Sequence, residues 1–330
     1  MRAININQFG GPEVCEIQET ATPAPSDGEV LIRVAYAGVN FIDVYMRNGT
    51  YVRSHTYKTP LPMVIGMEAS GTVEAVGDGV TDLKVGQRVA FCLSRGSYAE
   101  YVAVPAWKLV PLPDDISFEL GAAAMLQGCT AHYLSHSAFP LQRGQSCLIH
   151  AGAGGVGQLL IQLAKYVGAT VFTTVSTPEK ADIARSRGAD HCILYRDTNF
   201  REEVMKLTSG KGVDVVYDSV GKTTISNSIR SVRRRGLCVL FGASSGVVDA
   251  IEPLELAEAG SVFFTRPHLA DYMATAGEIR GRAEDLFRMV REKRLSMAID
   301  TVFPLADAAS AHRHIEGGKT RGKLLLQVSQ

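Results

Sequence analysis

The chain has 330 residues, of which 46% are hydrophobic and 21% are charged. Lys plus Arg and Asp plus Glu both number 34, so the charge balance gives no reason to expect binding to nucleic acid or to an anionic membrane. This length favours two domains over one, and the composition is that of an ordinary globular protein.

The N-terminal stretch "MRAININQFG" alternates like a β-strand and lacks the apolar core of a signal peptide. No run approaches the roughly 20 apolar residues that a membrane span needs. The six cysteines stand singly, without a CxxC pair, which argues against a disulfide framework and a four-cysteine zinc site. We therefore expect a cytoplasmic protein with reduced thiols.

Up to about residue 115 the pattern is one of strands and turns. The stretches 29–39 and 69–91 alternate and are interrupted by Gly-Asp and Gly-Gln turns. From residue 118 the period changes, and "FELGAAAMLQGCTAHYLSHSA" (118–138) predicts one helix.

Apolar strands then alternate with helices such as 178–187. The predicted strands are 146–151, 170–176, 191–196, 213–220, 236–242 and 261–267. Continuous apolar strands joined by helices indicate a parallel sheet that is covered on both faces. The basic run "RRR" (233–235) is predicted to form a solvated turn before a strand.

After residue 270 the sequence predicts a long helix, a strand at 298–305 and a final strand at 323–328. The pattern of strands and loops here is like that of the N-terminal part. We expect an α/β fold in which a doubly wound domain (121–267) is inserted in a β-rich domain built from residues 1–120 and 268–330.

Gly152, Gly154 and Gly157 fit the pattern G-x-G-x-x-G between a strand and a helix. In this context the first glycine permits a tight turn, the second lets a pyrophosphate approach, and the third allows close helix packing. The helix has an apolar stripe that includes Leu159, Leu160 and Leu163, and its N-terminus would face an anion. The stretch predicts a nucleotide site.

The end of the second strand indicates which nucleotide binds. NAD sites place an acidic residue about 20 residues after the glycines, on the ribose hydroxyls. Here Ser176 and Thr177 stand at this place, and Lys180 follows. A 2′-phosphate would be stabilised by Ser176 and Lys180, so the sequence favours NADPH over NADH.

Several motifs together resemble the medium-chain dehydrogenase/reductase superfamily, and most of all its quinone oxidoreductase (zeta-crystallin-like) branch. They are "GGPEV" (10–14), "AGVNFIDVYMRNGTY" (37–51), "VIGMEASGTVEAVG" (64–77), "HAGAGGVG" (150–157), "VYDSVG" (216–221), "FGASSG" (241–246) and "FFTRP" (263–267). The resemblance covers nearly the whole chain. It implies a GroES-like catalytic domain, a Rossmann domain, NADPH as the coenzyme and a homodimer, with the strand at 261–267 as the expected contact.

The resemblance also implies which residues bind the coenzyme. It assigns Gly155 and Val156 to the pyrophosphate turn, Ser176 with Lys180 to the 2′-phosphate end, and Tyr195 to the adenosine. The nicotinamide half is expected to lie against Thr130, Ser219, Gly242, Ser244, Ser245, Phe264 and Arg266. Phe41 and Thr177 are further coenzyme-binding residues that the resemblance implies. Where relatives carry an arginine near the C-terminus, this chain has Gly318, and either Lys319 or Arg321 is expected to take that role.

Zinc alcohol dehydrogenases of the superfamily hold their metal with a Cys and a His-Glu pair. The corresponding residues here are Asn40 and Met67-Glu68, and Asn and Met are poor zinc ligands. Cys92 is alone where those enzymes have a four-cysteine lobe. The pair His132 and His136, four residues apart without a further ligand, is interpreted as packing. We expect no metal.

Without a Lewis acid, hydride transfer requires an acceptor that is already electron-poor, such as a quinone or an enone. The resemblance implies an acceptor site lined by Asn40, Asp43, Tyr45, Tyr51 and Tyr133. Tyr51 and Asn40 are the predicted hydrogen-bond donors to the oxygen that gains charge.

The sequence therefore predicts a zinc-independent NADPH:quinone oxidoreductase that acts on a small molecule. Two alternatives remain open: an NADPH-dependent enone or alkenal reductase, and a crystallin-like, RNA-associated nucleotide-binding protein with weak turnover.

Overall fold

The computed structural model describes residues 1–329. The chain forms two compact units. Unit 1 contains residues 1–129, 272–288 and 297 onward, and unit 2 contains residues 130–271 and 289–296. The domain limits expected from the sequence, at residues 120 and 267, stay a prediction. The chain passes from unit 1 to unit 2 after Cys129 and returns to unit 1 after Asp271.

Unit 1 is built mainly from antiparallel sheets. Its strands are β1 (Arg2–Ile6), β2 (Glu16–Glu19), β3 (Glu29–Val39), β4 (Met63–Val64), β5 (Glu68–Val76), β6 (Arg88–Cys92), β7 (Tyr101–Pro105), β8 (Val110–Pro111), β15 (Ile299–Pro304) and β16 (Lys323–Gln327). One sheet has the order β2-β1-β4, and a second has the order β15-β16-β3-β5-β6-β8, with β7 paired to β3. The predicted strand at 29–39 is confirmed as β3, which pairs with three other strands.

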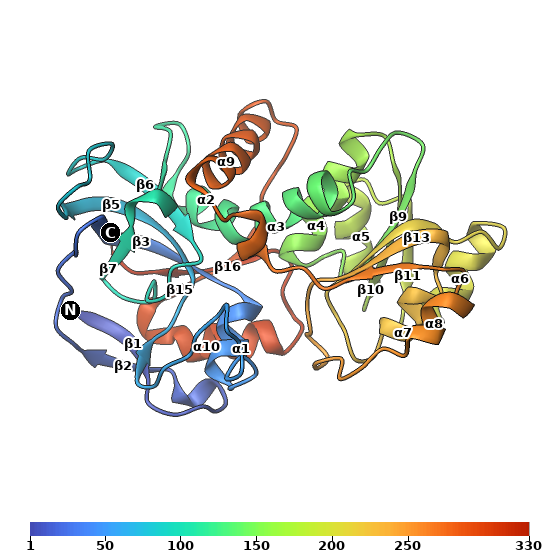
Figure 1. Ribbon diagram of the computed structural model, residues 1–330, viewed down its shortest axis with the longest axis horizontal. Helices are drawn as coiled ribbons and strands as arrows, with labels where there is room; N and C mark the ends of the chain where they lie inside the picture. The colour runs from blue at the N-terminus through green and yellow to red at the C-terminus, as the bar shows by residue number, and fades with distance from the viewer. Residues whose placement is uncertain (330) are drawn as a thin grey trace. The chain divides into compact units, whose positions relative to one another are not determined.

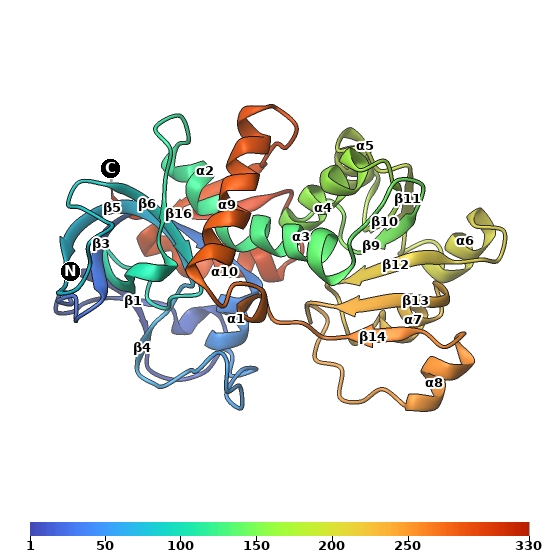
Figure 2. The ribbon, with the colours of Figure 1, turned by 45° about the horizontal axis from the view of Figure 1, so that its top comes forward.

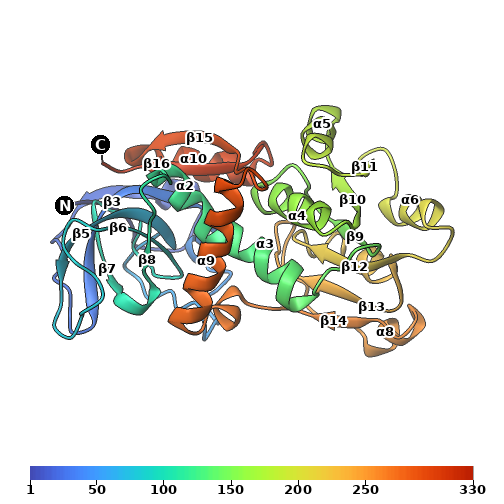
Figure 3. The ribbon, with the colours of Figure 1, turned by 90° about the horizontal axis from the view of Figure 1, so that it is seen from above.

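The helices of unit 1 are α1 (Phe41–Arg47), α2 (Phe118–Ala123) and α10 (Ala308–Glu316), and α9 (Ala276–Arg291) begins in it. Short 3₁₀ turns lie at Pro12–Val14, Ala106–Lys108 and Leu305–Asp307. Helix α10 lies beside β15 and β16 (Figure 3). Its buried face presents Ala308, Ala311, His312 and Ile315.

Unit 2 contains a parallel six-stranded sheet with the order β11-β10-β9-β12-β13-β14 (Figure 2). The strands are β9 (Ser146–Ile149), β10 (Thr170–Val175), β11 (His191–Leu194), β12 (Val213–Asp218), β13 (Val232–Leu240) and β14 (Phe263–Thr265). This is the order 3-2-1-4-5-6 of a doubly wound dinucleotide-binding sheet. The predicted α/β fold is confirmed.

Helices cover both faces of this sheet. They are α4 (Gly155–Tyr166), α5 (Pro178–Ser186), α6 (Phe200–Leu207), α7 (Ile225–Ile229) and α8 (Pro253–Glu258), and a 3₁₀ turn follows at Leu269–Tyr272. Helices α4 and α5 lie on one face, and α7 and α8 lie on the other (Figure 1). The predicted stripe of α4 is buried at Leu159, Leu160 and Leu163, which holds the helix against the sheet.

The helix expected at 118–138 is confirmed in extent, but two of its turns are π-helical. The segment is divided into α2, a π-helical turn at Ala124–Gly128, α3 (Cys129–Tyr133) and a second π-helical turn at Leu134–Ala138. Such turns occur where a helix gives up an ordinary i−4 hydrogen bond to another partner. In the first one, the Leu126 amide donates to the Glu68 carboxylate.

The expected turn at 233–235 is wrong, because these residues belong to a strand. Arg233, Arg234 and Arg235 lie inside β13, where the pairing register with β12 shifts and Arg235 has a positive φ of 56°. Arg233 donates to Asp214 at 2.7 Å. In the described part of the chain, no helix is both long and apolar enough to cross a membrane.

Candidate functional site

The glycine-rich turn joins β9 to α4 and leaves no room for a side chain at Gly152 or Gly157. A Cβ on Gly157 would lie 2.3 Å from the Ala151 carbonyl oxygen, and one on Gly152 would lie 2.1 Å from Thr173 Oγ1. Ala151 itself takes a positive φ of 55°. The helix therefore starts close against the strands, as the fingerprint requires.

Gly154 is the N-cap of α4 and offers no side chain to cap it. A Cβ at Gly154 would meet only the Ala151 oxygen, at 3.2 Å, so its outer side is open to a ligand. The first amides of a helix have no intrahelical acceptor and carry partial positive charge. The turn therefore fits a pyrophosphate, which the amides of Gly155 and Val156 would face.

The end of β10 carries hydroxyl groups and no acid. Ser176 is half-buried, and Thr177 is the N-cap of α5, where its Oγ1 accepts from the Lys180 amide at 3.3 Å. The Thr177 hydroxyl is therefore already used in capping. The first carboxylate after the strand is that of Glu179, which is exposed.

The neighbouring strand β11 ends at the same level. Val175 pairs with Leu194, and the Tyr195 amide donates to the Val175 oxygen at 3.2 Å. The Tyr195 side chain is 50% exposed. A large exposed ring at the carboxyl edge of a parallel sheet can flank a ligand, because ligands bind along this edge.

Asp218, at the end of β12, is a fully buried carboxylate with all its acceptor capacity used. Its Oδ1 accepts from the amides of Val220 and Gly221 at 2.8 and 3.0 Å, and its Oδ2 accepts from the hydroxyls of Thr224 and Ser228 at 2.7 and 2.6 Å. These bonds fix the turn that carries Ser219.

His150 continues this buried network between β9 and β10. Its Nδ1 lies 2.8 Å from Thr174 Oγ1 and its Nε2 lies 3.0 Å from Ser228 Oγ. Burial lowers the pKa of His150, against the opposing effect of Asp218. The network joins three adjacent strand ends beneath the glycine turn and makes this edge rigid.

The loop after β13 packs directly against the turn after β12. A Cβ on Gly242 would lie 2.4 Å from the Ser219 oxygen, and the Ser244 amide donates to that oxygen at 3.2 Å. Ser245 donates to the Val220 oxygen at 2.8 Å and accepts from the Thr223 amide. The predicted nicotinamide-side residues Ser219, Gly242, Ser244 and Ser245 thus come together.

The remaining predicted coenzyme residues of unit 2 lie on β14, directly after it, and on α3. Phe264 is half-buried and pairs with Cys238, and Arg266 donates to the Pro267 oxygen at 3.0 Å. Thr130 is buried on α3. Tyr133, predicted to line the acceptor, is also buried on that helix.

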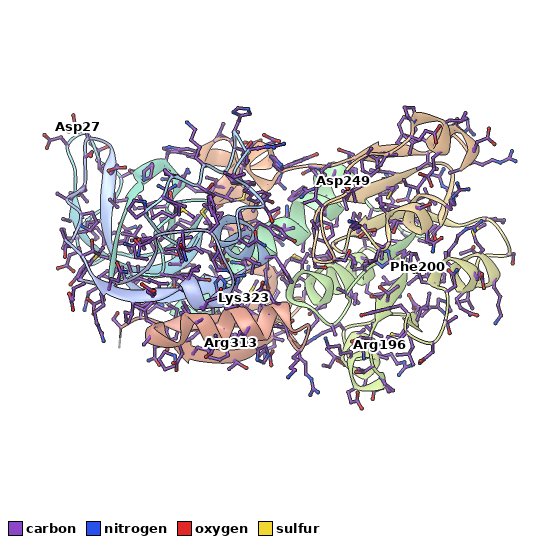
Figure 4. The ribbon with its side chains drawn as sticks, turned by 90° about the horizontal axis from the view of Figure 1, so that it is seen from below. Asp27, Arg196, Phe200, Asp249, Arg313 and Lys323 are labelled. Carbon is purple, nitrogen blue, oxygen red and sulfur yellow. The ribbon has the colours of Figure 1, made fainter. Side chains whose placement is uncertain are left out.

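In unit 1, Asn40 and Glu68 form a buried cluster with Lys323. Lys323 Nζ lies 2.5 Å from Glu68 Oε2 and 2.7 Å from Asn40 Oδ1, and Asn40 Nδ2 donates to Glu68 Oε2 at 2.8 Å. A Cβ on Gly38 would lie 2.1 Å from that same carboxylate oxygen. The cluster joins β5, β16 and the start of α1, and it leaves Lys323 inside the unit (Figure 4).

The Asn40 amide hydrogens are both engaged in this arrangement, because the second one points to the Gly38 oxygen at 3.4 Å. Its predicted role as a donor to the acceptor stays a prediction, and it would require the amide to leave Glu68. The geometry supports a different role, in which Asn40 fixes the start of α1.

Asp43 is fully buried, and its Oδ2 accepts from the Asn40 amide at 2.8 Å and from Tyr98 Oη at 3.1 Å. Its Oδ1 has no hydrogen-bond partner among residues 1–329. Burial raises the pKa of Asp43 to about 7, although Asn40, Lys323 and Tyr98 act to lower it.

Aromatic rings form a continuous row beyond Asp43. Phe41 contacts Tyr45 with centroids 5.9 Å apart, Tyr45 meets Tyr51 edge-on at 5.4 Å, and Tyr51 stacks on Tyr57 at 5.3 Å. Tyr51 is half-buried, and Tyr45 and Tyr57 are buried. The predicted residues Tyr45 and Tyr51 therefore come together, with Tyr57 as an unpredicted third ring.

The two C-terminal basic residues expected near the coenzyme also belong to unit 1. Lys319 and Arg321 are exposed, and the Arg321 amide donates to Asp300 at 3.0 Å. Within residues 1–329, no group of three or more His, Cys, Asp or Glu side chains is arranged to hold a metal ion. His132 and His136 stack in parallel with centroids 4.2 Å apart.

Buried polar groups that were not predicted support these sites: Arg47, Tyr98, His150, Asp218, His312 and Lys323. The signal that could have found some of them is a polar residue at the end of an apolar strand, as in "SCLIH" and "VDVVYD". Lys323 gives no such signal, because it stands at the start of its strand, β16.

Comparisons with known proteins agree with this architecture. The profile of the family described as alcohol dehydrogenase GroES-like domain matches residues 26–114, and that of the family described as zinc-binding dehydrogenase matches residues 155–288. The chain belongs to the quinone oxidoreductase branch of the medium-chain dehydrogenase/reductase superfamily.

Individual relatives extend over the whole chain. A quinone oxidoreductase of Pseudomonas aeruginosa is 41% identical over 98% of this chain and 99% of its own length. A 2-haloacrylate reductase of a Burkholderia species is 42% identical over 97% of each. The structure of Escherichia coli quinone oxidoreductase complexed with NADPH is 37% identical, with a TM-score of 0.96 over 99% of this chain and 100% of that one.

Proposed function

We propose that this chain is an NADPH-dependent quinone oxidoreductase that needs no zinc. One observation carries the proposal: an open, glycine-lined helix N-terminus lies beside a strand end that offers a hydroxyl and a lysine where NAD-binding proteins have an acid. The full-length similarity to quinone oxidoreductases, one of them solved with NADPH, supports it.

The coenzyme lies along the carboxyl edge of the parallel sheet. The amides of Gly155 and Val156 bind the pyrophosphate, Ser176 and Lys180 bind the 2′-phosphate, and Tyr195 flanks the adenosine. The loop residues Ser219, Gly242, Ser244 and Ser245, with Thr130, Phe264 and Arg266, line the nicotinamide half. Phe41 and one of Lys319 or Arg321 are further proposed coenzyme-binding residues.

NADPH, when bound, supplies the hydride, and the acceptor takes up one proton to become the hydroquinone. The residues of the chain orient the acceptor and support the oxygen that gains negative charge. Tyr45 and Tyr51 present aromatic faces to a planar acceptor. The Tyr51 hydroxyl donates to the charged oxygen.

The proposed independence from zinc rests on what surrounds Glu68. Its carboxylate is engaged by Lys323, Asn40 and the Leu126 amide. A metal at this place would have to displace a buried ammonium group, and the neighbouring Asn40 and Met67 are weak ligands.

A second candidate function is the reduction of activated alkenes. It is favoured by the relative described as a 2-haloacrylate reductase, which is 42% identical. Hydride transfer to a carbon conjugated with a carbonyl or carboxyl group places developing charge on an oxygen, as in quinone reduction. The same donor, Tyr51, would serve both reactions.

The decisive experiment follows the loss of NADPH absorbance with a panel of quinones, enones and 2-haloacrylate. We expect turnover with 1,4-benzoquinone, and turnover restricted to the alkenes would instead support the second function. Tight NADPH binding without turnover of any acceptor would contradict both and favour a crystallin-like, RNA-associated nucleotide-binding protein.

Replacing Tyr51 tests the proposed donor. Tyr51→Phe removes the hydroxyl and keeps the ring, so kcat for quinone reduction is expected to fall roughly tenfold or more, while the Kd for NADPH stays unchanged. The matched control is Tyr101→Phe in β7, which is expected to keep wild-type kcat. Unchanged kcat in Tyr51→Phe would remove this hydroxyl from the chemistry.

We also infer that two copies of the chain associate along β14, the edge strand of the parallel sheet. The cytoplasmic location expected from the sequence stays a prediction, as does the absence of membrane and nucleic-acid partners.

A further inference from the structure

The carboxyl ends of β10 and β11 lie next to each other, and the β11 end carries a cation, Arg196, in addition to Lys180. The two strands pair in parallel up to Val175 and Leu194, and the Tyr195 amide extends this pairing by donating to the Val175 oxygen. Arg196 is the next residue (Figure 4). It therefore lies at the strand end adjacent to the one that carries Ser176.

The backbone at Arg196 is fixed by a tight turn. The amides of Asp197 and Thr198 both donate to the Leu194 oxygen at 3.1 Å. The Arg196 side chain starts from this defined point and is exposed. A side chain mounted on a hydrogen-bonded turn loses less freedom on binding than one on a mobile loop, which favours a recognition role.

The other arginines that follow β10 are already paired. Arg185 donates to Asp182 at 2.8 Å, within one turn of α5. Arg187 donates to Gln158 Oε1 at 2.9 Å and to Ser296 Oγ at 2.5 Å. Both guanidinium groups therefore already have partners within unit 2.

Arg196 differs from these two. Among the described residues it forms no hydrogen bond and no ion pair, even though its neighbour Asp197 carries a carboxylate. A planar guanidinium with five donors suits the oxygens of a phosphate monoester better than a lysine does, because it can bind two of them at once.

We propose that Arg196 is a specificity-determining residue that binds the 2′-phosphate of the coenzyme together with Ser176 and Lys180. The proposal rests on the proposed function only in naming NADPH as the coenzyme. It predicts that Arg196 contributes to the binding of the phosphorylated coenzyme and contributes nothing to NADH.

The test compares ligands that differ only in the 2′-phosphate. Isothermal titration calorimetry measures the Kd of wild type and Arg196→Ala for NADPH and NADH, and for adenosine 2′,5′-bisphosphate and 5′-AMP. Loss of one charge-assisted bond is expected to weaken NADPH and the bisphosphate roughly tenfold to a hundredfold. The Kd values for NADH and 5′-AMP are expected to stay the same.

Two further variants sharpen the result. Arg196→Lys keeps the charge without the planar fork and is expected to recover part of the lost affinity. Arg185→Ala removes an equal charge from the neighbouring helix, and it is expected to leave all four Kd values unchanged.

An Arg196→Ala variant that binds all four ligands as the wild type does would overturn the proposal. An equal weakening for NADPH and NADH would also overturn it, because the effect would then not involve the 2′-phosphate. These binding measurements need no acceptor, so failure of quinone reduction would leave the outcome for Arg196 intact.

Discussion

Four fully buried polar side chains in unit 1 form one directional chain of hydrogen bonds. Arg47 donates to Nδ1 of His312 at 2.9 Å, so the proton of the neutral ring lies on Nε2. That nitrogen is 3.3 Å from Tyr98 Oη, whose own hydrogen goes to Asp43. The far end of the chain is Glu316, which holds Arg47 with two bonds of 2.8 and 2.9 Å.

Two titratable members of this chain, Asp43 and His312, have pKa values shifted in opposite directions. Burial raises the pKa of Asp43 from 3.8 to about 7, and burial, with Arg47 beside it, lowers the pKa of His312 from 6.5 to about 3. Between pH 4 and 6.5 the native Asp43 keeps a proton that the unfolded chain releases. Over the same range His312 is protonated in the unfolded chain and neutral in the native protein.

These two linkages oppose each other in the free energy of unfolding. The Asp43 contribution makes stability fall as pH rises, and the His312 contribution makes stability rise, each by at most about 1.4 kcal/mol per pH unit. In the wild type they largely cancel between pH 4 and 6.5.

Replacing either Asp43 or His312 should make the pH dependence that the other residue contributes measurable. Asp43→Asn leaves only the His312 linkage, so the free energy of unfolding is expected to rise with pH from 4 to 6.5, relative to wild type. His312→Gln leaves only Asp43, and stability is then expected to fall from pH 4 to 7. Urea unfolding at several pH values measures both slopes, and parallel curves for wild type and Asp43→Asn would contradict the account.

At the scale of elements, the repeating parts of the fold were predictable. Strands such as β3 and β10 and the buried face of α4 follow directly from apolar periodicity. The π-helical turns at Ala124–Gly128 and Leu134–Ala138 were not predictable, because the first depends on Glu68, which lies 58 residues away along the chain. The bulge at Arg235 in β13 likewise depends on the register with β12.

The edge strand β14 exposes an aromatic ring. Phe263 is 65% exposed, and β14 has a paired neighbour only on the β13 side within the described residues. Unpaired edges that expose large apolar side chains are templates for pairing with another strand. The proposed occupant is β14 of a second copy, which would continue the sheet across the contact.

A lysine at this position should prevent the association, because a charge on the edge opposes strand pairing. We expect wild type to sediment as a dimer and Phe263→Lys to sediment as a monomer in analytical ultracentrifugation. Val302→Lys, on the edge strand β15 of unit 1, is the matched control and is expected to remain dimeric. A monomeric wild type, or a dimeric Phe263→Lys, would contradict the proposed contact.

At the scale of the whole molecule, the chain separates two tasks into two units. Unit 2 offers the glycine turn, the strand ends and the buried Asp218 network, which suit a dinucleotide. Unit 1 offers the row of tyrosines, which suits a planar acceptor.

The glycine turn and the strand ends that the proposed sites use could be predicted, because they have local signatures. Their supports could not, since the cluster of Asn40, Glu68 and Lys323 joins residues 28 and 255 positions apart. Such buried charges are stable only beside partners that the fold brings together.

The central claim is that the end of β10 binds a phosphorylated coenzyme, and calorimetry tests it most directly. With one preparation of the wild-type protein, the Kd of NADPH is expected to be at least tenfold lower than that of NADH, since a single charge-assisted hydrogen bond accounts for about this factor. Equal Kd values for the two coenzymes would contradict the account.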